Sequence, residues 1–369
     1  MNVLFLTVPT GNGHTSCAKA IEKSLKNMGI NTYSIDVFGY SHKILGKAVS
    51  EIYLFASGKT PKLYGKYYDR EDYGKGNFIN VVSKFNIAIK NKIEKFIIEN
   101  NIDVVVCTHL FAGQVMTLIK EDIKTFNIGV VTDYTIHPKW ETTDLDCYVI
   151  ADNLLIPLAI KKGIGKEKLL PIGIPVDEKF SAKGNKAEAK RKLGFDEKPL
   201  LFVMMGSMGY GNMAAIVNEL DSAHGDFNMA IVCGNNEEAF ESIKNGIYKH
   251  NVKVYGFVNN VDEFMDAAEC IITKPGGLSV TESLAKKLPM IYIDPIPGQE
   301  ERNVEFLVNC GVGLMVSSVY TMSMAVTLFF GDETRRNEIQ NAVERLAKPD
   351  AAKKLAEFIE KRGGIIDKE

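Results

Sequence analysis

Gly276 and Gly277, followed by the carboxylate of Glu282, could together bind a nucleotide diphosphate. The β-branched run before them, residues 271–273, is typical of a strand that is buried on both faces. Glycine lets a phosphate approach the backbone closely, a helix N-terminus attracts its charge, and a carboxylate can hold ribose hydroxyls. The structural alternative is an ordinary α/β connection in which the glycines only make tight turns.

A second loop of unusual composition follows the first. Residues 290–293 predict another buried strand, which runs into the loop DPIPGQE at 294–300. Between the two loops we expect a helix over 282–287, with Ser279 or Thr281 as its cap. Ligands bind beyond the carboxyl ends of parallel strands, so both loops are expected to contribute to one nucleotide site.

His14 and Asp133 are the candidates for acid–base chemistry. His14 ends the turn after an expected buried strand at 3–8, and Asp133 directly follows another at 128–132. The pKa of histidine lies near neutral pH, which suits a base that removes the proton of a hydroxyl group. Asp133 could instead be that base, or it could orient His14 or the hydroxyl. The structural alternative is that His14 only caps the helix that follows.

The turn that contains His14 also resembles part of a dinucleotide-binding fingerprint. Gly11 and Gly13 form a G-x-G pattern, and Asp36 lies near the end of the next expected strand. However, Ser16 occupies the position of the third glycine in G-x-G-x-x-G. An NAD-dependent dehydrogenase is therefore an alternative that leaves the second half of the chain unexplained.

The composition is that of a soluble globular enzyme. With 369 residues the chain is too long for one typical core, so we expect two domains. The net charge of −2 gives no reason to expect nucleic acid as a partner. The 6 dispersed cysteines contain no C-x-x-C pair and are expected to be reduced core residues of a cytoplasmic protein. No leader peptide or bilayer-length apolar run is evident, so any membrane contact should be peripheral.

Strands and helices alternate in both halves, which predicts an α/β fold with parallel sheets. Residues 1–178 and 199–349 are expected to form two Rossmann-like domains that face each other across a cleft. The charged, alanine-rich stretch at 179–198 is the expected linker. The residues that could take part in catalysis or binding follow the ends of strands in both halves, so each domain would contribute one wall of the site.

Between residues 41 and 96 the chain has helical periodicity with many basic and aromatic side chains. Residues 59–68 are rich in lysine and tyrosine, and lysines are interspersed among apolar residues at 78–100. This pattern is typical of a segment that lies in a membrane interface. It is equally typical of an ordinary pair of amphipathic helices with solvated lysines.

Several motifs in this order resemble one family. They are Gly11-Asn12-Gly13-His14, Thr132-Asp133 with His137 and Trp140, Lys274-Pro275-Gly276-Gly277 with Thr281-Glu282, and Pro297-Gly298-Gln299-Glu300 with Asn303. Together they resemble the processive diacylglycerol glucosyltransferase and monogalactosyldiacylglycerol synthase family, which is more distantly related to MurG. The similarity extends over about residues 3–316, whereas the basic and aromatic segment and the C-terminal tail match loosely.

The resemblance implies a GT-B fold and an inverting transfer of a hexose from a UDP-sugar to a lipid. The lipid would be diacylglycerol, or a glycosyl-diacylglycerol, in the anionic inner face of the cell membrane, where the protein would bind peripherally. The final helix, 350–369, would pack back on the N-terminal acceptor domain. His14 would be the base, and the C-terminal domain would bind the donor.

The resemblance also assigns roles to donor-site residues. Glu282 would bind the ribose, Gly276 and Gly277 would approach the phosphates, and the backbone of Phe257 and Val258 would meet the uracil. Gln299 and Glu300 would hold sugar hydroxyls. The complete set of expected donor-site residues is Gly13, Gly206, Phe257, Val258, Gly276, Gly277, Ser279, Thr281, Glu282, Gln299, Glu300 and Asn303.

Asp144 and Asp146 have the spacing of a metal-binding Asp-x-Asp pair. We do not expect them to hold a metal, because alternate residues at the start of a strand point to one face and commonly meet water. Helix N-termini behind Gly206 and Gly276 could offset the charge of the diphosphate instead. The transfer is therefore expected to be independent of metal and of any other cofactor.

Three related functions stay open at this point. One is a MurG-like transfer of N-acetylglucosamine to a polyprenyl-diphosphate lipid, and another is a hydrolysing 2-epimerase of the same fold. The third is a nucleotide-sugar-sensing membrane protein without turnover. The roles of His109, His137 and Trp140 are expected to be structural or acceptor-shaping, with Trp140 either touching lipid or filling the core.

Overall fold

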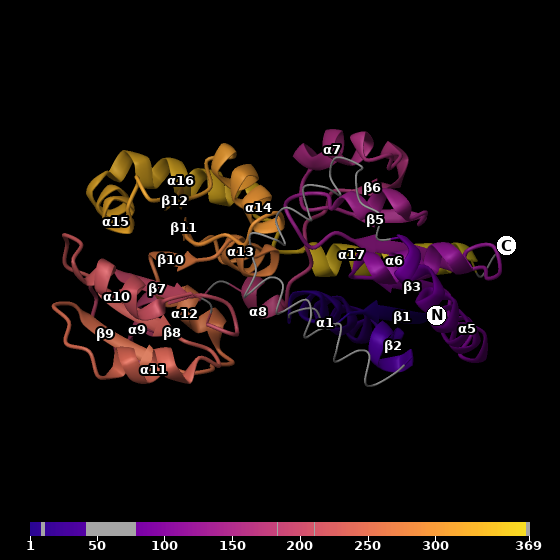
Figure 1. Ribbon diagram of the computed structural model, residues 1–369, viewed down its shortest axis with the longest axis horizontal. Helices are drawn as coiled ribbons and strands as arrows, with labels where there is room; N and C mark the ends of the chain where they lie inside the picture. The colour runs from indigo at the N-terminus through magenta and orange to yellow at the C-terminus, as the bar shows by residue number, and fades with distance from the viewer. Residues whose placement is uncertain (9–11, 42–78, 183, 210, 367–369) are drawn as a thin grey trace. The chain divides into compact units, whose positions relative to one another are not determined.

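The computed structural model describes residues 1–8, 12–41, 79–182, 184–209 and 211–366, drawn as ribbons in Figure 1. These residues form two compact units. Unit 1 comprises Met1–Glu178, Pro297–Gln299 and Asp350–Glu369, and unit 2 comprises Lys179–Ile296 and Glu300–Pro349. Gly11 and most of the basic and aromatic segment lie outside the described residues.

The described part of unit 1 contains a 6-stranded sheet in the order β2-β1-β3-β4-β5-β6. The strands are β1 (Asn2–Thr7), β2 (Asn31–Asp36), β3 (Val104–Cys107), β4 (Phe126–Val130), β5 (Cys147–Val149) and β6 (Leu169–Leu170). All the pairings are parallel. β3 is buried throughout and β1 is buried from Val3 to Thr7, and their side chains are mostly apolar, as expected of strands covered on both faces. The parallel sheet predicted for this half is therefore confirmed.

Helices cover this sheet and connect its strands. They are α1 (Asn12–Asn27), α2 (Val37–Ser41), α5 (Ile79–Glu99), α6 (Leu110–Ile119), α7 (Ile156–Lys161) and α17 (Ala351–Ile366), with the short 3-10 turns η1 (Pro138–Thr142), η2 (Asn153–Leu155) and η3 (Lys166–Lys168). The turn expected at Gly13 and His14 is the first turn of α1, which begins at Asn12.

The C-terminal helix α17 belongs to unit 1 and lies along α1 (Figure 1). Leu355 and Ile359 are fully buried on its inner face. Phe358 lies 6.1 Å from Phe126 of β4, centroid to centroid, and Arg362 lies over the same Phe126 ring. Each fully buried Leu or Ile side chain contributes roughly 1.5–3 kcal/mol, so a few such contacts are enough to hold this helix.

The described part of unit 2 repeats the architecture with a 6-stranded parallel sheet in the order β12-β11-β10-β7-β8-β9. Its strands are β7 (Leu200–Met204), β8 (Asn228–Val232), β9 (Asn251–Tyr255), β10 (Cys270–Thr273), β11 (Met290–Tyr292) and β12 (Leu314–Met315). Its helices are α8 (Glu178–Ser181), α9 (Lys186–Lys192), α10 (Met213–Asp221), α11 (Glu237–Lys244), α12 (Val261–Ala267), α13 (Gly277–Ala285), α14 (Gln299–Asn309), α15 (Met322–Gly331) and α16 (Glu333–Leu346). The parallel sheet predicted for the second half is also confirmed.

Two glycines set how the loops pack at the carboxyl edge of this second sheet. A side chain at Gly209 would meet the carbonyl oxygen of Cys233 at 2.1 Å, and one at Gly234 would meet that of Ser207 at 2.3 Å. Both glycines also have positive φ, 58° and 59°. The loop after β7 and the loop after β8 can therefore lie in backbone contact only because neither position carries a side chain.

The helix after the paired glycines begins earlier than expected. α13 starts at Gly277 with Gly276 as its N-cap, before either of the two expected caps. Ser279 and Thr281 lie within the helix, so the expectation that one of them caps it was wrong. Glycine is an acceptable cap, and the Thr281 hydroxyl donates instead to the carbonyl of Gly277 at 2.6 Å.

Trp140 fills the core of unit 1 and is only 4% exposed. Its ring meets Tyr148 edge-on at 6.0 Å. Side chains at Gly113 and Gly129 would lie only 3.1 and 3.0 Å from the indole, so these glycines make room for it. The core alternative for Trp140 is therefore confirmed. The cysteines are free, with Cys310 partly exposed and the others buried.

Candidate active site

The carboxyl edge of the unit 1 sheet brings His14 together with residues that follow two other strands. The Nδ1 atom of His14 lies 2.7 Å from the carbonyl oxygen of Thr108, which follows β3. It also lies 3.1 Å from the hydroxyl of Thr132, which follows β4. The sheet order places β1 beside β3 and β3 beside β4, so these groups are neighbours despite their distance in sequence.

The two contacts assign the tautomer of the His14 ring. A carbonyl oxygen can only accept, so Nδ1 carries the hydrogen and donates it to Thr108. The lone pair of the neutral ring is then on Nε2. His14 is therefore held through Nδ1, and the lone pair of its ring is on Nε2.

The surroundings of His14 keep its ring neutral. Burial lowers its pKa from the ordinary value of 6.5, and this effect outweighs the charge of Asp133 and the carbonyl of Thr108, which both act to raise it. A neutral imidazole at neutral pH is the form that can accept a proton. The negative charge of partly buried Asp133 would stabilise the imidazolium formed after that transfer.

His109 and His137 act as caps. Nδ1 of His109 accepts from the backbone N–H of Phe111 at the start of α6, and Nδ1 of His137 accepts from that of Lys139 at the start of η1. The ring of His109 also meets that of His14 edge-on at 4.6 Å. Burial lowers the pKa of His109 well below 6.5, so this neighbour is a neutral wall of the His14 site. Sequence reasoning singled out His14 but missed the contacts from Thr108 and Thr132.

The second group of expected residues lies at the carboxyl edge of the unit 2 sheet. Gly206 follows β7, Phe257 and Val258 follow β9, and Gly276 follows β10. Gly206 has a φ of +74°, which starts a tight turn. Phe257 is 57% exposed, an unusual state for a phenylalanine beside a strand end.

The paired glycines open directly onto a helix N-terminus, since Gly276 caps α13 and Gly277 is its first residue. Glu282 lies partly buried in the middle of this helix. By contrast, the helix after Gly206 begins only at Met213, so no helix N-terminus lies directly behind Gly206. That part of the expectation was wrong, because a turn over 206–209 and the cap Asn212 come first.

Glu300 and Asn303 bind parts of the two neighbouring loops. Glu300 is 7% exposed and its carboxylate accepts from Lys274 Nζ at 2.7 Å and from the backbone N–H of Ile296 at 2.9 Å. Asn303 is fully buried and donates to the carbonyl of Pro275 at 3.1 Å. These contacts join the loop after β10 to the loop after β11.

The remaining expected donor-site residues stand in helices. Gln299 is the first residue of α14 and is partly buried. Gly13 lies in the first turn of α1, next to His14 and far in sequence from the other expected donor-site residues, of which only Gln299 is also assigned to unit 1. Ser279 is partly buried in α13, where its carbonyl accepts from the Ser283 hydroxyl at 2.8 Å.

The Asp-x-Asp pair is engaged by lysines and backbone. Asp144 pairs with Lys120 at 3.0 Å and with Lys168 at 2.6 Å. Hydrogen bonds from Lys168 and then Lys120 hold the pKa of Asp144 below its usual value. Asp146 accepts from the backbone N–H of Asn127 at 2.8 Å. Within the described residues, no group of three or more His, Cys, Asp or Glu side chains is arranged to hold a metal ion.

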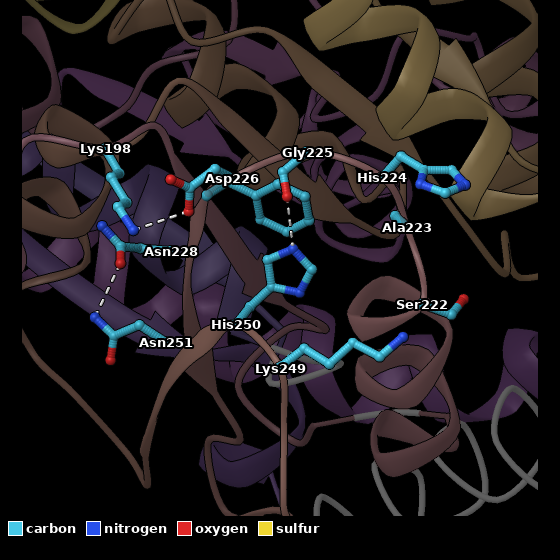
Figure 2. Close-up of a pocket in the computed structure, with 11 residues that line it drawn as sticks. Lys198, Ser222, Ala223, His224, Gly225, Asp226, Asn228, Lys249, His250 and Asn251 are labelled. Atoms are coloured by element: carbon cyan, nitrogen blue, oxygen red, sulfur yellow. Dashed lines mark hydrogen bonds and ion pairs between the residues drawn. The ribbon is translucent and has the colours of Figure 1, made fainter.

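A separate hollow of about 460 Å³ lies at the amino edge of the unit 2 sheet, where β8 and β9 begin (Figure 2). Its polar groups mostly bind one another. The His250 ring lies between Asp221 and the carbonyl of Gly225, each 3.1 Å away, and stacks on Phe227. This hollow lies at the edge opposite to Gly206 and Gly276, and its contacts are those of a packed structural corner.

Solved structures of the same fold align with nearly the whole chain. MurG of Acinetobacter baumannii has a TM-score of 0.63 at 13% identity, over 98% of this chain and 99% of its own. The calicheamicin glycosyltransferase CalG4 has a TM-score of 0.66 at 12% identity, over 99% and 98%. Anabaena HepE in complex with UDP has a TM-score of 0.56 at 12% identity, over 98% and 100%. The protein therefore has the GT-B fold of glycosyltransferases.

Family models divide the chain at the same place as the two sheets. Residues 14–176 match the monogalactosyldiacylglycerol (MGDG) synthase model, and residues 200–355 match the C-terminal domain of glycosyltransferase family 28. Each half of the chain therefore matches a glycosyltransferase domain, which supports a glycosyltransferase enzyme. The family resemblance of its motifs is thereby confirmed.

Curated relatives cover the full length. The processive diacylglycerol beta-glucosyltransferase of Bacillus licheniformis is 26% identical over 380 residues, which is 100% of this chain and 97% of the relative. A protein of the same name from Bacillus cereus is 26% identical over 365 residues, 97% of this chain and 92% of the relative.

Proposed function

We propose that this chain is an inverting glycosyltransferase that moves a hexose from a UDP-sugar to diacylglycerol or a glycosyl-diacylglycerol. Two relatives with that acceptor in their names align along its whole length, and a protein of the same fold binds UDP. The observation that carries the proposal is His14, whose Nδ1 is bonded to Thr108 so that Nε2 is left as the base.

In the proposed reaction the acceptor oxygen bonds to the anomeric carbon while the bond from that carbon to the diphosphate breaks. The hydroxyl proton passes to Nε2 of His14, and UDP leaves with the bonding electrons. Asp133, whose charge acts on His14, stabilises the imidazolium. One base and one attack from the face opposite the leaving group give inversion at the anomeric carbon.

Unit 2 is the proposed donor domain. Gly276 and Gly277 bring phosphate oxygens to the backbone at the start of α13, and Glu282 holds the ribose. Phe257 and Val258, after β9, meet the uracil. Gly206 follows β7, which pairs with β10, so it lies at the same edge of the sheet as Gly276.

We propose that the transfer needs no metal. Support comes from the ion pairs that occupy Asp144 and from the backbone bond that occupies Asp146. The N-terminus of α13 offers N–H groups to the leaving diphosphate, which is the charge compensation that a metal would otherwise supply. Activity in excess EDTA, matching activity in added Mg²⁺, is the expected result, and its loss in EDTA would contradict the proposal.

The acceptor is a membrane lipid, so we also propose peripheral binding to an anionic bilayer. Among the described helices, none is long and apolar enough to cross a membrane. A surface on η2, α7 and the following turn, which we call the α7 surface, is suited to an interface. Leu154 is 63% and Ile160 48% exposed, and Lys161 and Lys166 of the same stretch are exposed as well. It lies at the β5–β6 side of unit 1 (Figure 1). Apolar side chains flanked by lysines bind anionic lipid surfaces.

The test is to incubate the protein with vesicles of anionic phospholipid and diacylglycerol and a panel of UDP-sugars, and to identify the lipid product. A glycosyl-diacylglycerol with inverted anomeric configuration is the expected product. Vesicles that carry a polyprenyl diphosphate form the second arm. Transfer only to that lipid would favour a MurG-like reaction, and UDP-sugar binding without any transfer would favour a sensor.

A further inference from the structure

We propose that Lys274 binds the diphosphate of the donor, and that Glu300 is a resident counter-ion which positions this lysine until the donor arrives. This inference rests on the proposed function, because it assigns a part of the same donor site. It adds a mobile cation to a site so far built from glycines, a helix N-terminus and Glu282.

Lys274 and Glu300 form an ion pair at the carboxyl edge of the unit 2 sheet. Lys274 directly follows β10, and Glu300 lies in the first turn of α14 after β11. Nζ and Oε1 are 2.7 Å apart, and the two side chains are only 16% and 10% exposed. Because β10 and β11 are neighbouring strands, the pair connects the residue after β10 to the first turn of α14.

The carboxylate of Glu300 is held by a second hydrogen bond. Its other oxygen accepts the backbone N–H of Ile296 at 2.9 Å, in the loop that precedes α14. The side chain of Asn303, one turn further along α14, ties the same helix to the carbonyl of Pro275. Lys274 instead reaches Glu300 through a four-carbon stem with three rotatable N–H donors, so its ammonium can change partner without a change in the backbone.

The glycines of the proposed phosphate site surround the pair. A side chain at Gly206 would lie 3.3 Å from Cε of Lys274, and one at Gly276 would lie 3.4 Å from Oε1 of Glu300. Both glycines therefore border the ion pair, one on the lysine side and one on the carboxylate side. A diphosphate that approached these glycines would come within reach of the ammonium.

Charge favours a change of partner, in which the ammonium of Lys274 leaves the carboxylate of Glu300 for the diphosphate. A buried ion pair loses much of its Coulomb energy to desolvation, so it adds little to stability by itself. A diphosphate offers the ammonium more negative charge than one carboxylate does, and Arg and Lys are the usual cations at phosphate sites. When Lys274 turns to phosphate, Oε1 of Glu300 becomes available to a sugar hydroxyl, while Oε2 keeps its bond to Ile296.

The test compares UDP with uridine, which lacks the phosphates, by titration calorimetry. Lys274→Met should weaken UDP binding about tenfold or more, the loss of a charge-assisted hydrogen bond, and leave uridine binding unchanged. Glu300→Gln should bind UDP at least as tightly as the wild type, because the competing anion is gone, while sugar transfer slows. A double variant that removes both charges should also bind UDP weakly.

The matched control is Lys286→Met. Lys286 forms another buried pair in unit 2, with Asp266 at 2.8 Å, and its side chain is 3% exposed. It lies just beyond the carboxyl end of α13, whereas the paired glycines lie at the start of that helix. This variant should lose stability and keep wild-type affinity for UDP.

The inference alone would be overturned by unchanged UDP affinity in Lys274→Met and in the double variant. It would also be overturned by a parallel loss of uridine and UDP affinity, which indicates a merely structural pair. A fall in UDP affinity in Glu300→Gln equal to that in Lys274→Met would also overturn it. A wild-type protein that binds neither UDP nor uridine would overturn the proposed function, and the inference with it.

Discussion

The Nδ1 atom of His14 donates to the carbonyl oxygen of Thr108 across 2.7 Å, from the first turn of α1 to the end of β3. The two residues are 94 positions apart in the chain. This bond fixes both the tautomer and the direction of the ring, so the lone pair of the neutral ring is on Nε2.

The first prediction concerns His14 as the base. His14→Ala should lower the rate of sugar transfer by about 10²–10⁴-fold, the usual contribution of a general base, while UDP binding in unit 2 is unchanged. Single-turnover transfer and UDP titration measure the two effects. His224→Ala, at an exposed histidine of unit 2, is the control and should keep full activity. Wild-type turnover in His14→Ala would exclude His14 as the base.

The second prediction concerns pH. Because burial lowers the pKa of His14, the rate should rise with pH through a value below 6.5 and then level off. Asp133 acts to raise that pKa, so Asp133→Asn should move the acid limb of kcat/KM to lower pH and reduce the plateau. An acid limb that shifts upward in Asp133→Asn would contradict this arrangement.

The third prediction concerns Glu282 and the ribose. Glu282→Ala should weaken UDP binding by about 1.5–3 kcal/mol, the value of a hydrogen bond to a charged group. Titration calorimetry with UDP measures this loss. Glu188→Ala, an exposed carboxylate on α9 of the same unit, should bind UDP as the wild type does. Equal UDP affinity in both variants would remove Glu282 from the site.

The fourth prediction concerns the α7 surface. Replacing Leu154 and Ile160 together with serine should reduce co-sedimentation with anionic vesicles several-fold, since both side chains are exposed and little folding energy is lost. Ile98→Ser removes an equally exposed apolar side chain (62%) from α5 of the same unit and should leave vesicle binding intact. The proposed interface fails if the two changes have the same effect.

The fifth prediction concerns acid stability. Burial acts to raise the pKa of Asp221, but N–H groups of His250 and Lys249 outweigh it and hold the pKa below 3.8. A lowered folded-state pKa stabilises the fold above about pH 4 and loses that contribution as pH falls. Asp221→Asn should therefore unfold more easily at pH 7, with the difference from wild type fading toward pH 3. A constant difference in urea midpoint across that range would contradict this.

Much of the fold could be predicted from the order of residues. The buried runs at 128–132 and 271–273, followed by Asp133 and by a glycine-rich turn, indicated parallel sheets and the edge at which a ligand would bind. The motifs at His14 and at Gly276-Gly277 also gave the family. These features depend on neighbouring residues, so they can be read without knowledge of long-range contacts.

Other features of the site depend on strand order. Lys274 and Glu300 stand 26 positions apart, and no local pattern indicates that they bind each other. Trp140 could have touched lipid or filled the core until Gly113 and Gly129 were found to make room for it. The start of α13 at Gly277 was missed because Ser279 and Thr281 are better caps by residue type.

The sequence by itself determined the parallel architecture, the family and the residue types at each strand end. Only the tertiary structure decided that His14 presents Nε2 and that Glu300 holds Lys274. The physical reason is that hydrophobic periodicity is set by residues a few positions apart, whereas hydrogen bonds between strand-end loops depend on which strands are neighbours in the folded sheet.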